Sequence, residues 1–542
     1  MRKTLVPRRT FVTAIAALLC AVTLTSCGIF RIEEVSPDPS TPPSEPTTSP
    51  VQPLPSAAPD LGDDRFSLRY TPSASLNPIT STDANNTQLA QLCYEGLFTL
   101  DEKFAAVPLL CAEYSTEDGM TYVFKLRGDI AMTDGTILDA YDAAYSVNQA
   151  RDSARYKSRL RNIASCEATG FSELTIKLKK TDYALPTLLD FGIVKYGFMG
   201  AIPIGSGPYR YVSADGDAML VAFESYRDYD KLSVKTIHLV ECPDSSIGEY
   251  FTALTIDLIA VDPNGSLTPQ IRRDHESRYY DTTAFQYIGF NPRTAAVADS
   301  RVRRAIALAV DRETIVSNTL DGRAIAAPLA FSPAHPLYNA SWVPSETHIP
   351  AVEMSNLLHD AGMYDTDNDL WLDYPTFDGY EPVKLTLLVA QENPARVAAA
   401  RSVADALQRV GVNVAVTEVS YSVFATRLAN GSFDLYYGET RLPANFDLTE
   451  LLTNGGALNF GNMGGSDYAE LIDNFLASPD DATRAGAAQA LCRKIYSECP
   501  IIPIAFMQHA VYSARGAIRE LPLSPSGVFR RITEWTFLQK YN

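Results

Sequence analysis

An alternation of strand and helix patterns in the C-terminal half of the chain constrains its fold more than any other feature. Residues 384–390 (KLTLLVA) form a short apolar run that predicts a β-strand. Residues 393–410 repeat apolar side chains at helical spacing and end at Gly411, which predicts a helix that stops there. A strand, a short helix and a strand are predicted next, over residues 412–419, 423–428 and 433–437. Such alternation favours an α/β layer with parallel strands.

The stretch after the last of these strands carries a candidate functional pair. Gly438 ends the apolar run, and Glu439, Thr440 and Arg441 follow in a sequence typical of neither helix nor strand. Ligands of open α/β sheets bind beyond the carboxyl ends of the strands. In an extended chain residues 439 and 441 point to the same side, so we expect both side chains to share the rim of a crevice. There they either contact a ligand or form an ion pair with each other.

Further α and β elements are predicted around this layer. Residues 299–310 (DSRVRRAIALAV) predict a helix that Asp299 or Ser300 caps, because apolar side chains gather on one face. A strand over residues 285–290 precedes this helix. The N-terminal part is richer in β-structure, with strands predicted over residues 65–70, 121–126, 174–178 and 219–223.

The N-terminus predicts export and a lipid anchor. A basic start (MRKTLVPRR) precedes an apolar run over residues 11–22, which is too short to span a bilayer but typical of a signal peptide. The run closes in Leu-Thr-Ser-Cys at residues 24–27, which resembles the lipobox of bacterial lipoproteins. This resemblance implies a signal peptide over residues 1–26, cleavage before Cys27, and lipidation with palmitate-type acylation of Cys27. The alternative is an ordinary signal peptide followed by an unrelated cysteine.

Residues 27–62 predict a tether. They are rich in Pro, Ser and Thr and lack the large apolar residues that a core requires. No later apolar run approaches the length of a membrane-spanning helix. We therefore expect the chain to sit at the extracellular face of the bacterial cell membrane, and to contact the membrane through its lipid anchor alone.

Length and charge narrow the class of protein. Of the 542 residues, about 480 remain for folded structure, which is more than one hydrophobic core usually organises. At least two domains are expected. The formal net charge of −18 argues against nucleic acid as a partner, because phosphates demand a basic surface.

The cysteines leave two interpretations open. Cys20 would leave with the signal peptide, which leaves six cysteines beyond the anchor: Cys93, Cys111, Cys166, Cys242, Cys492 and Cys499. An even number outside the cell permits disulfides, whose pairing the sequence does not fix. Burial as reduced thiols is the alternative. None of them shows C-x-x-C spacing, so a zinc site is not expected.

No motif predicts catalysis or a cofactor. Asp365, Asp367 and Asp369 resemble the start of a calcium loop, but Leu370 replaces the usual Gly and Thr376 replaces the final Glu. A solvated acidic loop is the expectation, with calcium as the alternative. The histidines form no H-E-x-x-H pair and no G-x-S-x-G motif occurs. We expect no metal, no cofactor and no enzymatic activity.

Several segments together resemble one family, in the order in which that family shows them. They cover residues 76–103, 122–147, 204–211 (IGSGPYRY), 287–291, 300–316, 357–373 and 455–473. The similarity runs from about Phe66 to the C-terminus. These segments resemble the bacterial extracellular solute-binding proteins of the oligopeptide and dipeptide type (solute-binding family five), which serve ABC importers.

The resemblance implies a two-lobed, periplasmic-binding-protein-like α/β fold with an extra domain inserted in the first lobe. The first lobe would cover residues 63–284, including an inserted domain at about 95–195. The second lobe would cover residues 285–508, and residues 509–542 would return to the first lobe. Such proteins enclose a peptide by domain closure and bind its main chain in an extended, strand-like mode.

The sequence departs from this family after the last predicted strand. Peptide binders often carry an Asp there, in a W-G-A-D-Y-P-D-P-like segment, which pairs with the peptide's α-ammonium group. Here the segment is Y-G-E-T-R-L-P-A, and Thr440 lies nearest to the Asp position. Glu439 is the candidate for the ammonium group and Arg441 for a carboxylate or carbonyl. Tyr437, Asn459 and Asn462 complete the candidate ligand-binding residues.

The sequence as a whole predicts a monomeric, lipid-anchored substrate-binding protein. It would capture an oligopeptide or dipeptide by lobe closure and deliver it to the permease and ATPase subunits of an ABC importer. Two alternatives stay open. One is a binder of another solute, such as a sugar or a metal chelate, and the other is a peptide sensor that is not coupled to transport.

Overall fold

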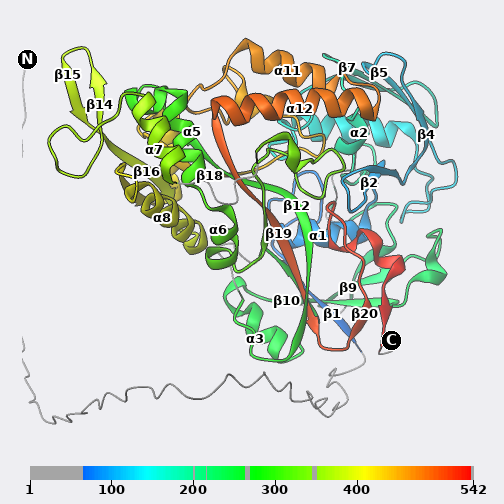
Figure 1. The fold of residues 1–542 in the computed structure, drawn as a ribbon. Helices are drawn as coiled ribbons and strands as arrows, with labels where there is room; N and C mark the ends of the chain where they lie inside the picture. Colours follow the sequence, from blue (N-terminus) through cyan, green and yellow to red (C-terminus); the bar gives the residue numbers. More distant parts are fainter. Residues whose placement is uncertain are drawn as a thin grey trace, which may run out of the picture. The chain divides into compact units, whose positions relative to one another are not determined.

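The computed structural model describes residues 65–198, 200, 202–214, 216–262, 269–344 and 351–538. The predicted signal peptide, Cys27 and the tether lie outside the described residues. Within these ranges, every helix is too short or too polar to cross a membrane. The described chain is a mixed α/β structure, as predicted (Figure 1).

The main sheet of the described residues has eleven strands. In order of pairing they are β17 (Asn413–Val419), β16 (Lys384–Ala390), β18 (Leu435–Arg441), β12 (His275–Phe290), β19 (Ile501–Ala514), β11 (Leu258–Val261), β1 (Phe66–Tyr70), β10 (Thr236–Glu241), β9 (Asp217–Ala222) and β8 (Tyr209–Ala214), with β13 (Ala324–Ala326) beside β19. The long strands β12 and β19 run side by side and antiparallel, from His275 opposite Ala514 to Gly289 opposite Ile501 (Figure 1).

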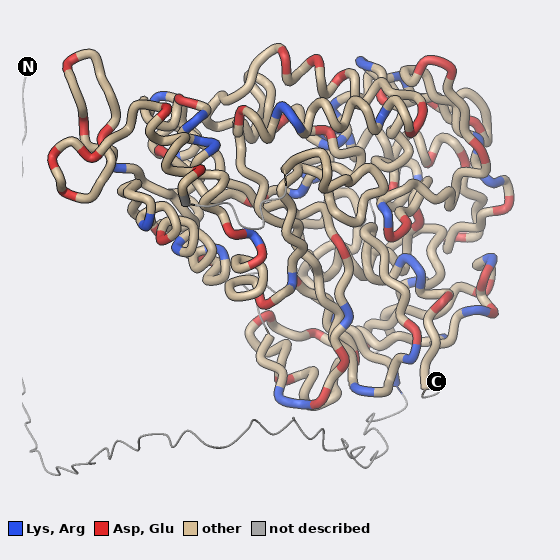
Figure 2. Tube along the Cα trace, viewed as in Figure 1, with Lys and Arg blue, Asp and Glu red and all other residues tan. Residues whose placement is uncertain are grey.

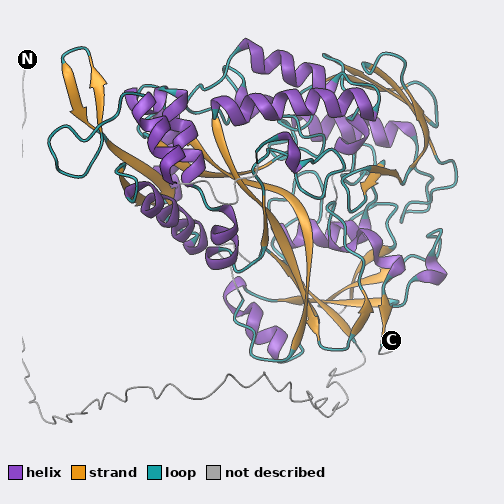
Figure 3. Ribbon diagram, viewed as in Figure 1, coloured by secondary structure: helices purple, strands orange, loops and turns teal. Residues whose placement is uncertain are grey.

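The predicted α/β layer is confirmed at one end of this sheet. β16 pairs in parallel with both β17 and β18. The helix α8 (Pro394–Gln408) packs on β16 and β17 (Figure 3). The helix α9 (Tyr421–Asn430) ends at Gly431, which has a φ of +64° and closes the helix in the left-handed conformation.

The strand β18 is longer than predicted. It was expected to end at residue 437, but it continues through Arg441. The cause is antiparallel pairing with β12, in which Leu435 lies opposite Phe290 and Arg441 opposite Ala284. Residues 438–441 therefore belong to the sheet rather than to a loop.

A smaller, four-stranded sheet lies between residues 111 and 178. Its strands pair in the order β4 (Cys111–Ser115), β5 (Thr121–Leu126), β7 (Glu173–Leu178) and β6 (Ile163–Ala168). The helix α2 (Ala140–Asp152) packs against β6 and β7. The remaining strands form three two-stranded sheets: β2 (Phe98–Leu100) with β3 (Ala106–Pro108), β14 (Asp373–Thr376) with β15 (Gly379–Pro382), and β20 (Ile518–Glu520) with β21 (Thr536–Phe537).

The other helices surround these sheets. The predicted helix near residue 300 is α5 (Ser300–Ala309), and the Asp299 carboxylate accepts a hydrogen bond from the Arg301 amide, as its capping role requires. The rest are α1 (Ala84–Cys93), α3 (Ile247–Thr252), α4 (Ala295–Ala298), α6 (Arg312–Thr319), α7 (Ala351–Asp360), α10 (Thr449–Leu452), α11 (Ser466–Leu476) and α12 (Asp481–Glu498).

Three hydrophobic clusters hold most of the buried side chains. The first core draws on residues 66–280 and 511–535. The second core draws on residues 284–507. The third core draws on residues 285–506, together with Phe104. The strand β12 contributes to both of the first two cores: Tyr280 belongs to the first core and Ala284 to the second.

The six cysteines beyond the anchor are buried, free thiols. Of the two interpretations of these cysteines, the structure therefore agrees with buried, reduced thiols and not with disulfides. Burial raises the pKa of the Cys93, Cys111 and Cys166 thiols to about 12. Such thiols stay protonated and unreactive at neutral pH.

Candidate functional site

A cavity of about 580 Å³ lies where β12, β18 and β19 meet the helix α1. Its volume falls within the range of about 300–1,000 Å³ that is typical of small-ligand sites. It is lined by Pro78, Thr82, Ala84, Thr87, Gln88, Ala90, Gln91, Leu100, Arg155, Tyr156, Ser158, Arg159, Arg161, Asp190, Phe191, Gly192, Tyr280, Thr283, Arg441, Leu442, Pro443, Ala444, Asp447, Glu450, Leu451, Leu458, His509, Pro525, Ser526, Gly527 and Arg530.

The walls of this cavity come from two different hydrophobic cores. Tyr156 and Phe191 belong to the first core. Leu442 and Leu451 belong to the third core. A ligand in the cavity would therefore contact both.

Arg441 is the one of the six candidate residues that lines the cavity. It is the last residue of β18, and its side chain is exposed. Among the described residues, none forms an ion pair or hydrogen bond with its guanidinium group. Its charge is therefore available to a ligand.

Two further polar side chains lie near Arg441 in the cavity wall. The Tyr280 hydroxyl lies 3.4 Å from His509 Nδ1. Burial lowers the pKa of His509 to about 3, and the Arg441 guanidinium adds to the decrease. Burial raises the pKa of Tyr280 to about 12, although Arg441 opposes that change. At neutral pH Arg441 thus lies beside a neutral imidazole and a protonated hydroxyl.

Glu439 does not line the cavity and does not pair with Arg441. It forms an ion pair with Arg396 on α8, with 3.1 Å between Oε2 and Nη2. Gln286 Nε2 donates to the same oxygen at 2.8 Å. The alternative of an ion pair between residues 439 and 441 is thus wrong, because α8 offers Glu439 a half-buried partner, Arg396.

Tyr437 belongs to the same hydrogen-bonded group as Glu439. Its side chain is fully buried in the second core. Its hydroxyl donates to Gln286 Oε1 at 2.9 Å. Thr440 is half-buried and lies opposite Phe285 in the pairing of β18 with β12. Neither side chain lines the cavity.

Asn459 and Asn462 lie in a loop next to the cavity but do not line it. Asn459 Nδ2 donates to the carbonyl oxygens of Thr453 at 2.9 Å and Met463 at 2.6 Å. The Asn462 side chain is exposed and accepts a hydrogen bond from the Gly455 amide at 3.4 Å. Both amides thus hydrogen-bond within their own loop. Leu458 of this loop is the residue that reaches the cavity.

The sequence interpretation missed four other arginines in the cavity wall. They are Arg155, Arg159, Arg161 and Arg530. With Arg441, the wall carries five guanidinium groups against three carboxylates, those of Asp190, Asp447 and Glu450. The signal in the sequence is the segment RYKSRLR at residues 155–161, a cluster of cations in an acidic chain.

The three carboxylates are already paired with arginines. Arg161 forms ion pairs with Asp447 and, at 3.0 Å, with Glu450. Asp190 pairs with Arg159 and accepts a hydrogen bond from Ser526 Oγ at 2.8 Å. Burial raises the pKa of Asp190, but Arg159, Ser526 and Arg530 together lower it by more, so the pKa of this carboxyl group lies below its usual value.

Two of the remaining arginines hydrogen-bond to neutral oxygens. Arg155 donates to Thr87 Oγ1 at 3.0 Å and to the Ser81 carbonyl at 3.4 Å. Arg530 donates to the carbonyls of Tyr94 at 2.9 Å and Asp190 at 3.0 Å. Neither forms an ion pair with a carboxylate in the described part of the chain.

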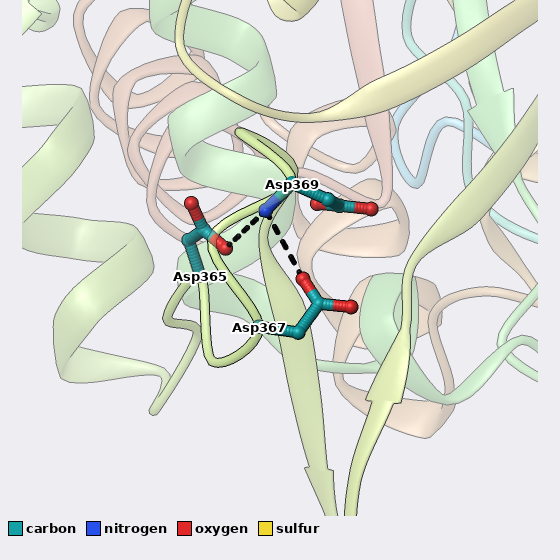
Figure 4. A group of neighbouring side chains, drawn as sticks. All are labelled: Asp365, Asp367 and Asp369. Atoms are coloured by element: carbon teal, nitrogen blue, oxygen red, sulfur yellow. Dashed lines mark hydrogen bonds between the residues drawn. The ribbon is translucent and has the colours of Figure 1, made fainter.

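The acidic loop lies outside the cavity wall. Ligand oxygens of Asp365, Asp367 and Asp369 lie within 4.8 Å of one another (Figure 4). The Asp369 amide donates to the other two carboxylates, each at 3.2 Å. Leu370 adopts a φ of +76° at the position where a calcium loop has Gly. A solvated acidic loop without an ion forms the same internal hydrogen bonds, so they do not distinguish it from a calcium loop.

Comparisons with known proteins identify the family. The sequence model of "Bacterial extracellular solute-binding proteins, family 5 Middle" matches residues 105–451. The oligopeptide-binding protein AppA of Bacillus subtilis is 28% identical over 397 residues, which cover 66% of this chain and 69% of AppA. The glutathione-binding protein GsiB of Escherichia coli is 32% identical over 149 residues, which cover 25% of this chain and 29% of GsiB.

Solved structures show the same fold. AppA of B. subtilis in complex with a nonapeptide superposes with a TM-score of 0.64 at 22% identity, covering 88% of this chain and 99% of AppA. NikZ of Campylobacter jejuni in complex with Ni(L-His) gives 0.65 at 20% identity, covering 87% and 99%. The family model spans more than half of the chain. The chain therefore belongs to the bacterial extracellular solute-binding proteins of family 5, the substrate-binding proteins of ABC importers.

Proposed function

We propose that this chain captures a peptide-like solute in the cavity beside Arg441 and delivers it to the permease and ATPase subunits of an ABC importer. The proposal rests on one observation: the cavity wall contains side chains of both the first and the third core. A solute that binds there stabilises the arrangement in which the two cores face each other, which is how domain closure is driven.

The lobes of this proposal follow the cores. The first lobe comprises residues 63–284, with an inserted domain at about 95–195, and residues 509–542. The second lobe comprises residues 285–508. The change from the first to the second core along β12, between Tyr280 and Ala284, supports this division. Two contacts connect the proposed lobes: Asn445 Nδ2 donates to Asp182 Oδ2 at 2.8 Å, and Lys180 forms an ion pair with Asp473 at 2.7 Å.

The relatives support a peptide-like solute. AppA is an oligopeptide-binding protein and GsiB a glutathione-binding protein. A metal chelate is the second candidate, because the unpaired Arg441 suits the carboxylates of a chelate and the neutral His509 suits a metal ion. NikZ, whose fold is shared, was solved with Ni(L-His).

The place of action is also a proposal. Cleavage before Cys27 and its lipidation would hold the monomeric protein at the extracellular face of the membrane, with residues 27–62 as a spacer. The lipobox-like residues 24–27 support it.

The direct test is to identify what the protein carries. The full chain would be purified from its host in detergent and analysed by native mass spectrometry, with the bound compound then released by acid and sequenced or fragmented. We expect a short peptide or a peptide-like compound. A sugar or another compound without amide bonds would contradict the proposal, and a carboxylate chelate with its metal would favour the second candidate.

A further inference from the structure

The cavity has a charge that the rest of the protein does not share. The chain carries a formal net charge of −18, and acidic and basic residues are interspersed over the described chain (Figure 2). The cavity wall instead has five arginines against three carboxylates. The surplus of positive charge is therefore a local property of this site.

The ion pairs within the wall leave three arginines without a carboxylate partner among the described residues, and two of these, Arg155 and Arg441, are exposed. Asp190 is paired with Arg159, and Asp447 and Glu450 share Arg161. Arg155 and Arg441 have no carboxylate partner among the described residues, and both side chains are exposed. The cavity thus offers a ligand two cations, while each of its carboxylates already has an arginine.

The surroundings of Arg441 suit an anion. Its guanidinium group can bind a carboxylate through two parallel hydrogen bonds. Tyr280 keeps its hydroxyl proton, and the neutral ring of His509 lies next to it, so both offer polar groups without adding negative charge. Glu439 is the nearest carboxylate along the strand, but it pairs with Arg396, accepts a hydrogen bond from Gln286 and does not line the cavity.

Closure of the lobes makes the charge of the ligand decisive. An exposed guanidinium is stabilised by water, and a ligand that displaces this water leaves the charge uncompensated unless it brings an anion. A neutral peptide brings one carboxylate and one ammonium group, so it leaves one of the two exposed cations, Arg155 or Arg441, uncompensated. It would therefore bind at a cost, and a cationic solute at a larger one.

We propose that the cavity selects a solute of net negative charge, which places a carboxylate on Arg441. This inference rests on the proposed function in one respect, that the cavity is the solute site. It goes beyond that function because it names the charge of the solute: an acidic peptide, or a carboxylate-rich chelate with the same chemistry.

The test compares probes that differ in charge alone. The tripeptides Ala-Glu-Ala, Ala-Gln-Ala and Ala-Lys-Ala have the same length, and tricarballylate with and without Ni²⁺ represents the chelate. Each would be titrated into the full chain by calorimetry after removal of bound ligand. We expect Ala-Glu-Ala to bind at least about tenfold more tightly than Ala-Gln-Ala. A tenfold difference corresponds to about 1.4 kcal/mol, which is less than the loss of a buried charge partner usually costs.

Variants assign the preference to one side chain. Arg441→Gln should reduce the preference for Ala-Glu-Ala over Ala-Gln-Ala to less than about threefold, because the charged partner of the glutamate is removed. Arg441→Lys should retain part of this preference. Arg409→Gln is the matched control, because Arg409 is also exposed, forms no ion pair among the described residues and lies outside the cavity wall. It should leave the preference unchanged. Added salt should weaken Ala-Glu-Ala more than Ala-Gln-Ala.

The outcomes separate this inference from the proposed function. Equal binding of the three tripeptides would overturn the inference and leave the peptide function standing. Binding of tricarballylate, lost in Arg441→Gln, without binding of any peptide would support the inference and overturn the peptide function. Binding of none of the probes would overturn both. If Arg441→Gln does not fold, Arg441→Lys and the salt dependence decide, and a preference that salt does not reduce would contradict the inference.

Discussion

Arg396 on α8 forms an ion pair with Glu439 on β18, with 3.1 Å between Nη2 and Oε2. Gln286 on β12 donates a second hydrogen bond to the same oxygen. The pair links α8 to the sheet and holds Glu439 away from the cavity, whereas Arg441 lines the cavity wall.

The first prediction separates these two arginines. Arg396→Gln should lower the free energy of unfolding by about 1–3 kcal/mol, because the half-buried Glu439 carboxylate loses its charged partner. Ligand affinity should stay unchanged, in contrast to Arg441→Gln. Denaturant unfolding and calorimetry with Ala-Glu-Ala measure the two effects. Arg401→Gln is the control on the same helix, since its ion pair with Glu418 is more exposed and should be worth less than about 1 kcal/mol. A loss of affinity in Arg396→Gln would show that Glu439 acts on the ligand.

The second prediction concerns the contact of Arg161 with Asp447 and Glu450. Arg161→Gln leaves two carboxylates close together without their shared cation. Amide hydrogen exchange over residues 445–453 should then accelerate about tenfold, which corresponds to about 1.4 kcal/mol of local opening free energy. Lys125→Gln removes an exposed ion pair with Glu113 and should leave this exchange unchanged. Equal exchange in wild type and Arg161→Gln would contradict a bridging role for Arg161.

The third prediction concerns pH. Burial raises the pKa of Asp182 to about 6, in spite of hydrogen bonds from the Ala184 amide and Asn445. The pKa of Asp182 is higher in the folded than in the unfolded chain, so protonation of this carboxyl group stabilises the fold. This contribution is fully present below about pH 4 and is lost as the pH rises through 6. The shift corresponds to on the order of 3 kcal/mol. The thermal midpoint of the wild type should therefore rise relative to Asp182→Asn as pH falls from 7 to 5. A difference between the two proteins that stays constant with pH would contradict the raised pKa.

The fourth prediction concerns the anchor. Cys27→Ala should release the protein from the membrane fraction into the medium, because each buried methylene of the acyl chains contributes about 0.8 kcal/mol of membrane binding. Immunoblots of the fractions and metabolic labelling with palmitate provide the measurement, and wild-type protein is the control. Retention of Cys27→Ala in the membrane fraction would refute the lipid anchor.

Local patterns of the sequence predicted much of the fold. The strand over residues 384–390 and the helices α5, α8 and α9 were expected near their observed bounds, because helical and strand periodicity is a property of neighbouring residues. The cap at Asp299 was expected for the same reason. The extension of β18 to Arg441 was not, because it depends on pairing with residue 284, far away in the sequence.

The candidate site was predicted less well, for a related reason. Alternation along a strand places residues 439 and 441 on one side, but it does not say that Arg396 reaches Glu439 from α8. The arginines of residues 155–161 come from a segment that no local pattern links to β18. Sequence reasoning placed Arg441 beyond a strand end, at the rim of a crevice, and the structure puts it in a cavity wall. It missed the other residues of that wall, which only the fold brings together.

The register irregularity of β12 has a mechanical consequence. It lies between Asp281 and Phe285, where β12 passes from the first core to the second. Arg441 pairs with Ala284 inside this short interval. A solute that contacts Arg441 would therefore touch the strand segment that connects the two cores, so its binding would bear on the relative orientation of both.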